Sequence, residues 1–439
     1  MAMRNDTYLA QDFDIFVEST GERDNRERDA SSVQTGAESQ TTDNEDKEKI
    51  KLSSDSVSSA INGISKIKAL CDEKGISLTV VCQPLYYSVF ESFEFSDIEE
   101  FYTQLAAVCS FWDFSYNSLS FDFRYFYDDL SFKTAVGGMV ADRIVGGGDL
   151  YCPDDFGVYV TKENVKEHLG SIDSASSADE SEYTANVPVL MYHHVGYPGD
   201  DSTVITPELF EEHIKALSQA GYTSVTMEEL KNYVNYGADL PEKPVVITFD
   251  DGYLSNYEYA YPILEKYGMK ATIFVIGATV GNTEYYKDTQ YPITPHFTWE
   301  QGAEMVESGV ISLQSHTYDM HQWPDYEEGT ARENILQLEG ESEEDYIEHL
   351  TSDCQESRSG IEENCDSEVF AIAYPYGLYS PLTQVVLAEN GYEISFTTNP
   401  GENTVIKGLG QSLYALNRYT MSQGVSVQQL LDWVSSARG

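Results

Sequence analysis

Residues 245–252 read VVITFDDG, an apolar run that ends in two adjacent carboxylates and a glycine. A short run rich in β-branched residues, without polar alternation, is typical of a strand buried on both faces in a parallel sheet. Asp250 and Asp251 therefore fall at the carboxyl end of a predicted buried strand. In barrels built from βα units, this end of the strands forms the active face.

Strand and helix patterns alternate on both sides of this stretch, from residue 187 to residue 439. Strands are expected at 187–193, 245–249, 271–276, 311–315, 371–374 and 393–397. Helices are expected at 206–220, 226–236, 257–267, 298–308, 382–390 and 425–434. Repeated βα units over about 250 residues predict an α/β fold whose parallel sheet forms a closed or distorted (β/α) barrel.

A smaller α/β module is expected before this domain. Residues 1–48 form an acidic tail poor in apolar residues, so most of it is predicted to be disordered. Residues 49–170 then show helical patterns and one strand pattern, and the Ser/Ala/Asp-rich stretch 171–186 is interpreted as a linker. Within the module, helices are expected from Val57 to a stop at Gly75 and at 97–109, 134–145 and 161–169, and a strand at 76–82.

Composition limits the classes of partner and site. The chain carries 74 Asp and Glu against 26 Lys and Arg, a net charge of −48, which should repel nucleic acid and anionic membrane surfaces. The sequence contains no run of 18 apolar residues, so no membrane span is predicted. Residues 1–13 lack the apolar core of a signal peptide. The six cysteines include no CxxC pair, but Cys354 and Cys365 are candidates for a disulfide.

A second stretch supplies two imidazoles directly after a predicted strand, because residues 315–321 read SHTYDMH. Residues five apart face different sides of a helix or strand, so His316 and His321 meet at one ion only if the chain turns between them. Together with Asp251 they form an Asp/His/His set that suits zinc, or another divalent ion such as cobalt, nickel or manganese. Asp250 would remain free beside the ion as a base.

Each half of this site also has a plainer interpretation, since Asp-Asp-Gly is good turn chemistry and most histidine pairs are surface features. The convergence of four predicted strand ends favours the functional interpretation. The groups at these ends are His193 with His194, Asp250 with Asp251, His316, and the YPYG segment 374–377.

Residues 187–439 resemble the polysaccharide deacetylase family, also known as the NodB-homology or carbohydrate esterase family 4 domains. The resemblance rests on FDDG at 249–252, on SHTYDMH at 315–321 and on YPYG at 374–377. The longer spacing of the two histidines, and MYHHV at 191–195, are similar to the poly-N-acetylglucosamine deacetylase branch. The resemblance implies a distorted barrel of the NodB type.

By this resemblance, Asp250 is the catalytic base, and Asp251, His316 and His321 hold the divalent ion. The backbone N–H of Tyr376 is implied to help hold the oxyanion. The implied substrate is an acetylated polysaccharide, either a surface glycan or peptidoglycan. Such polymers lie outside the membrane, so an extracellular or cell-surface location is expected.

The chain departs from the family pattern in two places. The third motif often carries an arginine that orients the base; it is missing here, and Arg418 is expected to pair with Asp250 instead. The fifth motif, often Leu-x-His, reads LNR at 416–418, so its general acid is also missing. Candidate proton donors are His193, His194 and His296, of which His193 is predicted to take part in catalysis.

Residues 50–170 faintly resemble the C-terminal part of SGNH-type hydrolase-like modules. The stretch 125–132 is similar to the Asp-x-x-His block of that group, but Ser131 stands at the histidine position. Because a serine cannot act as the base of a Ser-His-Asp triad and no Gly-Asp-Ser block precedes it, the module is interpreted as an inactive remnant. A spacer or a binding domain is the expected role.

Three functions are consistent with these motifs. The leading hypothesis is a metal-dependent deacetylase of N-acetylated glycans. The alternatives are an esterase that removes O-acetyl groups from xylan-like chains, and a glycan-binding protein with a vestigial metal site. The intact Asp250 favours an enzyme, because a pure binding protein has no need of a base beside a metal ligand.

Overall fold

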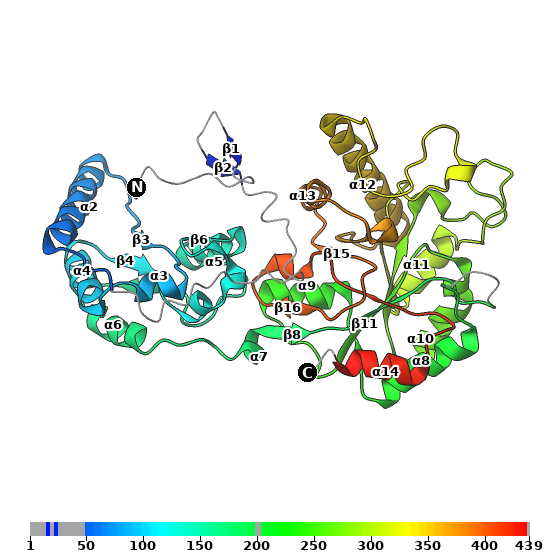
Figure 1. Cartoon of the computed structure of the whole chain (residues 1–439), viewed down its shortest axis with the longest axis horizontal. Helices are drawn as coiled ribbons and strands as arrows, with labels where there is room; N and C mark the ends of the chain where they lie inside the picture. The colour runs from blue at the N-terminus through cyan, green and yellow to red at the C-terminus, as the bar shows by residue number, and fades with distance from the viewer. Residues whose placement is uncertain (1–14, 18–21, 25–48, 198–202, 437–439) are drawn as a thin grey trace.

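The structure is a computed structural model that describes residues 15–17, 22–24, 49–197 and 203–436. The predicted disordered tail, 1–48, lies outside the described residues except for two short paired strands, β1 (Ile15–Val17) and β2 (Glu22–Asp24). Figure 1 shows the rest of the chain as a smaller N-terminal module beside a larger C-terminal part. In the described ranges, no helix is both long and apolar enough to cross a membrane.

The C-terminal part is built on an eight-stranded sheet in the order β15-β14-β13-β12-β11-β9-β17, with β10 beside β11. Every ladder in this sheet is parallel, which confirms the predicted α/β fold with a distorted barrel. Its strands are β9 (Val189–Tyr192), β10 (Thr223–Ser224), β11 (Pro244–Phe249), β12 (Ala271–Val275), β13 (Ile311–Ser315), β14 (Ala371–Ala373), β15 (Ile394–Phe396) and β17 (Tyr419–Thr420).

The apolar run that ends at Phe249 forms β11, and all six residues of this strand are buried. Val245, Ile247 and Phe249 pack into one hydrophobic cluster, whereas Val246 packs into another, so the strand is covered on both faces. This double burial is the reason that the sequence shows no polar alternation here. It also carries the following Asp250 and Asp251 into the interior of the domain.

Helices pack around this sheet (Figure 1), and most of them begin at the residues that the sequence predicts. The Thr206 side chain caps α8 and Pro207 occupies its first turn, while Thr226 and Glu229 form a capping box at α9. The helices are α8 (Pro207–Gln219), α9 (Met227–Tyr236), α10 (Tyr261–Tyr267), α11 (Trp299–Glu307), α12 (Glu343–Cys365), α13 (Pro381–Glu389) and α14 (Val427–Ser436).

The helix predicted at 257–267 differs from the observed element. A π-helical turn covers Asn256–Ala260 and passes directly into α10. Pro262 therefore lies near the junction of the π-helical turn and α10, inside a continuous helical stretch, where its missing N–H removes one hydrogen bond from the helical pattern. The predicted helix is thus present, but its first part has π-helical hydrogen bonding.

Helix α12 was not predicted, because its sequence is mostly polar. Its buried face nevertheless follows helical spacing, with Tyr346, Leu350, Cys354 and Ile361 turned inward. The candidate disulfide does not form, since Cys354 and Cys365 are both buried free thiols on this one helix. At 1.5 Å of rise per residue they lie about 16 Å apart along the helix, far beyond the reach of a disulfide.

The N-terminal module has a three-stranded sheet, β3-β4-β7, and a two-stranded β5-β6 hairpin. The predicted strand 76–82 shortens to β3, and the predicted helix 161–169 begins later, at α6. Ser131 lies on β6, and Asp128 accepts a hydrogen bond from the Leu130 N–H at 3.0 Å, which is ordinary turn chemistry. The elements are α2 (Ser54–Lys74), β3 (Val81–Cys82), α3 (Tyr87–Glu91), α4 (Phe95–Val108), β4 (Phe111–Asp113), β5 (Phe126–Asp128), β6 (Ser131–Phe132), α5 (Thr134–Val145), β7 (Val158–Val160) and α6 (Val165–Asp173).

The stretch expected as a linker, 171–186, is partly folded. It contains α7 (Glu180–Tyr183) and β8 (Thr184–Asn186), and β8 pairs antiparallel with β16 (Thr404–Ile406) of the C-terminal part. The Tyr125 hydroxyl also donates to the Lys407 carbonyl at 2.7 Å. The strand pairing joins the stretch 171–186 to the C-terminal part, and the Tyr125 contact joins the N-terminal module to it. The domain bounds 49–170 and 187–439 stay predictions.

Candidate metal centre

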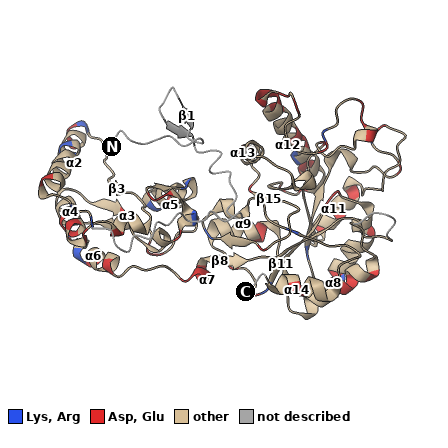
Figure 2. Ribbon diagram, viewed as in Figure 1, with Lys and Arg blue, Asp and Glu red and all other residues tan. Residues whose placement is uncertain are grey.

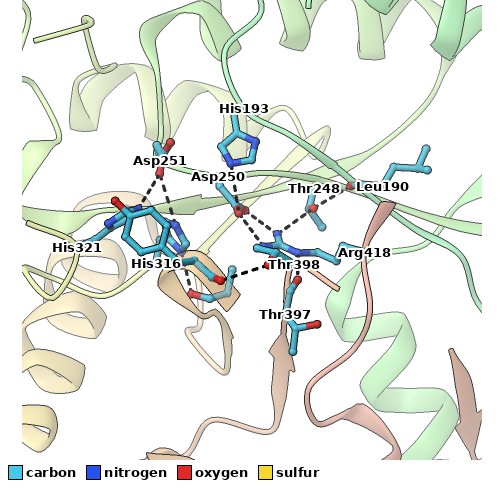
Figure 3. A network of polar contacts seen from close by, with 12 residues as sticks. Leu190, His193, Thr248, Asp250, Asp251, His316, His321, Thr397, Thr398 and Arg418 are labelled. Carbon is cyan, nitrogen blue, oxygen red and sulfur yellow. Dashed lines mark hydrogen bonds and ion pairs between the residues drawn. The ribbon is translucent and has the colours of Figure 1, made fainter. Parts of the chain in front are cut away.

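The polar groups singled out in the sequence follow strands that are neighbours in the sheet. Phe249, the last residue of β11, is in register with Tyr192 of β9, and Ser315, the last residue of β13, is in register with Val275 of β12. The residues that follow these strands therefore emerge at one edge of the sheet. Figure 3 shows Asp250, Asp251, His193, His316 and His321 gathered there.

Asp251, His316 and His321 lie close enough to share one ion. The Nε2 atoms of His316 and His321 are 3.5 and 3.8 Å from Asp251 Oδ1. One ligand atom from each residue lies within 4.8 Å of the other two. In a tetrahedral zinc site with bonds of about 2.0–2.2 Å, neighbouring ligand atoms are about 3.4 Å apart, and the two distances to Asp251 Oδ1 are close to this value.

The protonation states of these residues also fit a cation. His316 Nδ1 lies 2.8 Å from the Ala373 carbonyl, which can only accept, so Nδ1 carries a proton; in the neutral ring the Nε2 lone pair then faces Asp251. Burial lowers the pKa of His321 to about 4, so this imidazole is neutral near pH 7. Asp251 Oδ1 is buried and accepts no hydrogen bond from any described residue. A buried acceptor without a donor, beside two imidazole nitrogens, is suited to a divalent cation.

Asp250 lies beside this group and is held by Arg418. The guanidinium donates from Nη1 to Oδ1 and from Nη2 to Oδ2, each at 2.7 Å, and its Nε donates to the Thr397 carbonyl (Figure 3). Both side chains are buried. Burial alone would raise the pKa of Asp250, but Arg418, His316 and His193 together hold it well below its usual range.

The three candidate proton donors have different surroundings in the structure. His193 Nε2 lies 3.9 Å from Asp250 Oδ2, and 17% of its side chain is exposed. His194 Nδ1 lies 2.8 Å from the Ser255 hydroxyl. His296 is almost fully buried, and burial lowers its pKa to about 4. Of these three, His193 is the histidine placed beside the predicted base.

Three residues of the site have left-handed backbone conformations although none is a glycine. Asp251 has φ 72°, Thr317 has φ 74°, and Tyr376 has φ 57°. Such conformations are unfavourable for residues with a side chain, above all for the β-branched Thr317, and persist only where the surroundings enforce them. Tyr376 lies in the middle of the YPYG motif, and in this left-handed conformation its ring lies 4.8 Å from the His321 ring.

A row of aromatic rings extends from His321. Trp323 lies parallel to the His321 ring at 5.9 Å, and Tyr326 lies 6.4 Å beyond Trp323. Tyr291 then stacks on Tyr326 at 4.7 Å, and 47% of its surface is exposed. These rings flank the candidate metal centre with a partly exposed aromatic surface.

Sequence reasoning missed one residue that contacts the metal-binding loop. The Asp353 carboxylate accepts hydrogen bonds from the backbone N–H groups of Tyr318 and Asp319, at 2.8 and 2.7 Å. It was overlooked because helix α12 was overlooked. The four-residue steps from Tyr346 to Leu350 and Cys354 were the available signal, since they turn the adjacent Asp353 inward as well.

Comparisons with known proteins point to one family. The family described as "Polysaccharide deacetylase" matches residues 237–395. YxkH of Bacillus subtilis (strain 168), whose name assigns it to the polysaccharide deacetylases, is 34% identical over 254 residues, which cover 58% of this chain and 78% of the relative. A poly-beta-1,6-N-acetyl-D-glucosamine N-deacetylase of Staphylococcus aureus (strain MRSA252) is 29% identical over 44% of this chain and 60% of its own length.

The chain thus spans less than two thirds of that staphylococcal relative. Among solved structures, a Streptococcus pyogenes deacetylase, PplD in complex with acetate, is similar at 26% identity. The match covers 57% of this chain and 98% of that chain, with a TM-score of 0.46.

Proposed function

The chain belongs to the polysaccharide deacetylase family, and from this premise we propose that it hydrolyses N-acetyl groups of a glycan with the help of a divalent ion. One observation carries the proposal: Asp251, His316 and His321 converge within ligand distance of one another while Asp250 stays outside the set, bound to Arg418. The donor set favours zinc, and cobalt, nickel and manganese are alternatives. An ion held there would supply Lewis acidity and an activated water near neutral pH.

The residues around the ligand set take distinct roles in this proposal. Asp250 accepts the proton of the attacking water, and Arg418 keeps this carboxylate ionised and fixed in orientation. The Tyr376 N–H stabilises the developing oxyanion. His193, whose Nε2 lies 3.9 Å from Asp250 Oδ2, donates a proton to the leaving amine.

The aromatic row supports an extended glycan as substrate. Trp323, Tyr326 and Tyr291 continue from His321 along the surface, and such rings offer apolar faces to which sugar rings can pack. The staphylococcal relative is named for poly-β-1,6-N-acetyl-D-glucosamine, so we propose a polymer of N-acetylglucosamine. A polymer of this kind lies outside the membrane, which places the proposed activity at the cell surface or beyond it.

The test is acetate release from poly-N-acetylglucosamine, chitin oligomers and acetylxylan in the presence of zinc or cobalt. Replacing Asp250 with Asn should lower the rate by about 10²–10⁴-fold, the usual loss when a general base is removed. Zinc affinity should change little, because Asp250 is not one of the proposed ligands. Asp366→Asn is the matched control, since Asp366 is an exposed helix cap in a left-handed conformation that Asn also adopts.

Each outcome separates the alternatives. Equal acetate release by the parent and Asp250→Asn would remove Asp250 as the base. Release from acetylxylan alone would favour the O-acetyl esterase. Zinc binding without acetate release from any of the three substrates would favour a glycan-binding protein.

A further inference from the structure

The loop that carries the two histidines must bring both imidazoles to one point. His316 directly follows β13, and His321 must return to the same point five residues later, which no regular element achieves. The intervening backbone includes Thr317 at φ 74°, a costly conformation for a β-branched residue. Contacts outside the loop are therefore needed to hold it in this shape.

Hydrogen bonds from two directions hold the loop. On one side, the carbonyls of Thr317 and Tyr318 accept from the N–H groups of Gly277 and Ala278, at 3.1 and 2.9 Å. On the other side, the N–H groups of Tyr318 and Asp319 donate to the two carboxylate oxygens of Asp353. One helix side chain thus binds both central N–H groups of the loop.

Stability alone does not explain why an aspartate lies at position 353, behind the histidine loop. Its side chain is buried on α12, and no cationic side chain among the described residues forms an ion pair with it. Burial raises its pKa to about 7, against the lowering effect of the two N–H groups. A buried carboxylate without a counter-charge costs free energy, so its retention needs a local reason.

We propose that Asp353 is a positioning residue of the metal centre, which holds the loop 317–320 so that His321 faces His316 before any ion binds. The inference rests on the proposed function, because it concerns the proposed ligands of the ion. A carboxylate suits this task, since two N–H donors need two acceptor oxygens. Asparagine offers one oxygen, and its NH₂ group would face an N–H donor.

The experiment measures zinc affinity in the full chain after removal of metal, by competition with a chromogenic chelator. Asp353→Asn should raise the zinc dissociation constant by about tenfold or more, as when other supporting partners of metal ligands are removed. The absorption spectrum of the cobalt-loaded variant should also change. Glu362→Gln is the matched control, because Glu362 lies on the same helix and accepts the Val369 N–H at 3.0 Å, and its zinc affinity should stay that of the parent.

Amide hydrogen exchange provides a test that needs no variant. In the metal-free parent, the amides of Tyr318 and Asp319 should already be protected, because Asp353 orders them without the ion. Rapid exchange of these amides until zinc is added would overturn the proposal, even if Asp353→Asn fails to fold.

The outcomes separate this inference from the function on which it rests. A parent that binds none of zinc, cobalt, nickel and manganese would refute the proposed function. A parent that binds zinc, with a folded Asp353→Asn variant of equal affinity, would overturn the role of Asp353 alone. Weakened zinc binding in Asp353→Asn with an unchanged Glu362→Gln control would support it.

Discussion

At the scale of single residues, the pair of Asp250 and Arg418 is explained better by chemistry than by stability. A buried ion pair often contributes little net stability, because the cost of removing both charges from water offsets their attraction. What the bidentate contact does provide is a carboxylate that stays ionised and points in one direction. Both properties are needed in a base that lies beside a metal ion.

The pH dependence of catalysis should therefore report on Arg418. Arg418→Lys keeps the positive charge but loses the bidentate fork, so the pKa of Asp250 should rise. Because Asp250 acts in its ionised form, the acidic limb of the kcat/KM profile should move to higher pH. Arg358→Lys is the control, since Arg358 donates to the backbone carbonyls of Val369 and Asn390 and touches no carboxylate of the site. An acidic limb that stays in place would contradict this assignment.

At the scale of elements, α12 shows how a helix can be hidden in a polar sequence. Its stripe of Tyr346, Leu350, Cys354 and Ile361 has helical spacing, but the many carboxylates between these residues obscure it. Tertiary packing against α11, α13 and β13 stabilises the helix, because its own composition provides a weak signal. The element then supplies the side chain that binds the histidine loop.

The geometry of α12 predicts that its two cysteines are reduced thiols. Cys354 and Cys365 should both react with an alkylating agent when the protein is denatured without reductant, because one helix separates them beyond bonding distance. Mass spectrometry of the digested protein would detect the two modified peptides, with a fully reduced sample as reference. A peptide pair linked through these two residues would show that α12 does not form as described.

At the scale of the whole molecule, charge is the dominant feature. Figure 2 shows Asp and Glu distributed over helices of both parts of the chain. With a net charge of −48, these groups repel one another in the compact state. Such self-repulsion opposes folding and is screened by salt.

Thermal stability should therefore rise with ionic strength. Raising NaCl from about 0.01 to about 0.15 M shortens the screening length from about 30 to about 8 Å, which weakens repulsion between the carboxylates. The measurement is the Tm by scanning calorimetry, with a chelator present so that metal binding does not vary. A Tm that stays constant or falls over this range would show that the acidic groups are too well separated to matter.

Much of this architecture could be predicted from local patterns. The buried strand β11, the capped helices α8 and α9, and the strand end with Asp250 and Asp251 all follow from periodicity and capping residues within a few positions. Local signals sufficed because burial on both faces, an N-cap or a proline in the first turn acts over one or two turns of chain. The shortened β3 and the π-helical start of α10 could not be predicted, since neighbouring elements decide them.

The sequence by itself determined the fold class and the residue types of the site, because apolar periodicity and the Asp-Asp and His-His motifs are local properties. Only the tertiary structure decided how the site is assembled. Arg418 reaches Asp250 from the far end of the chain, a pairing expected only through the family resemblance, and Asp353 reaches the histidine loop from a helix that follows it. No spacing encodes these contacts, because they depend on which strands become neighbours and on which helix packs behind them.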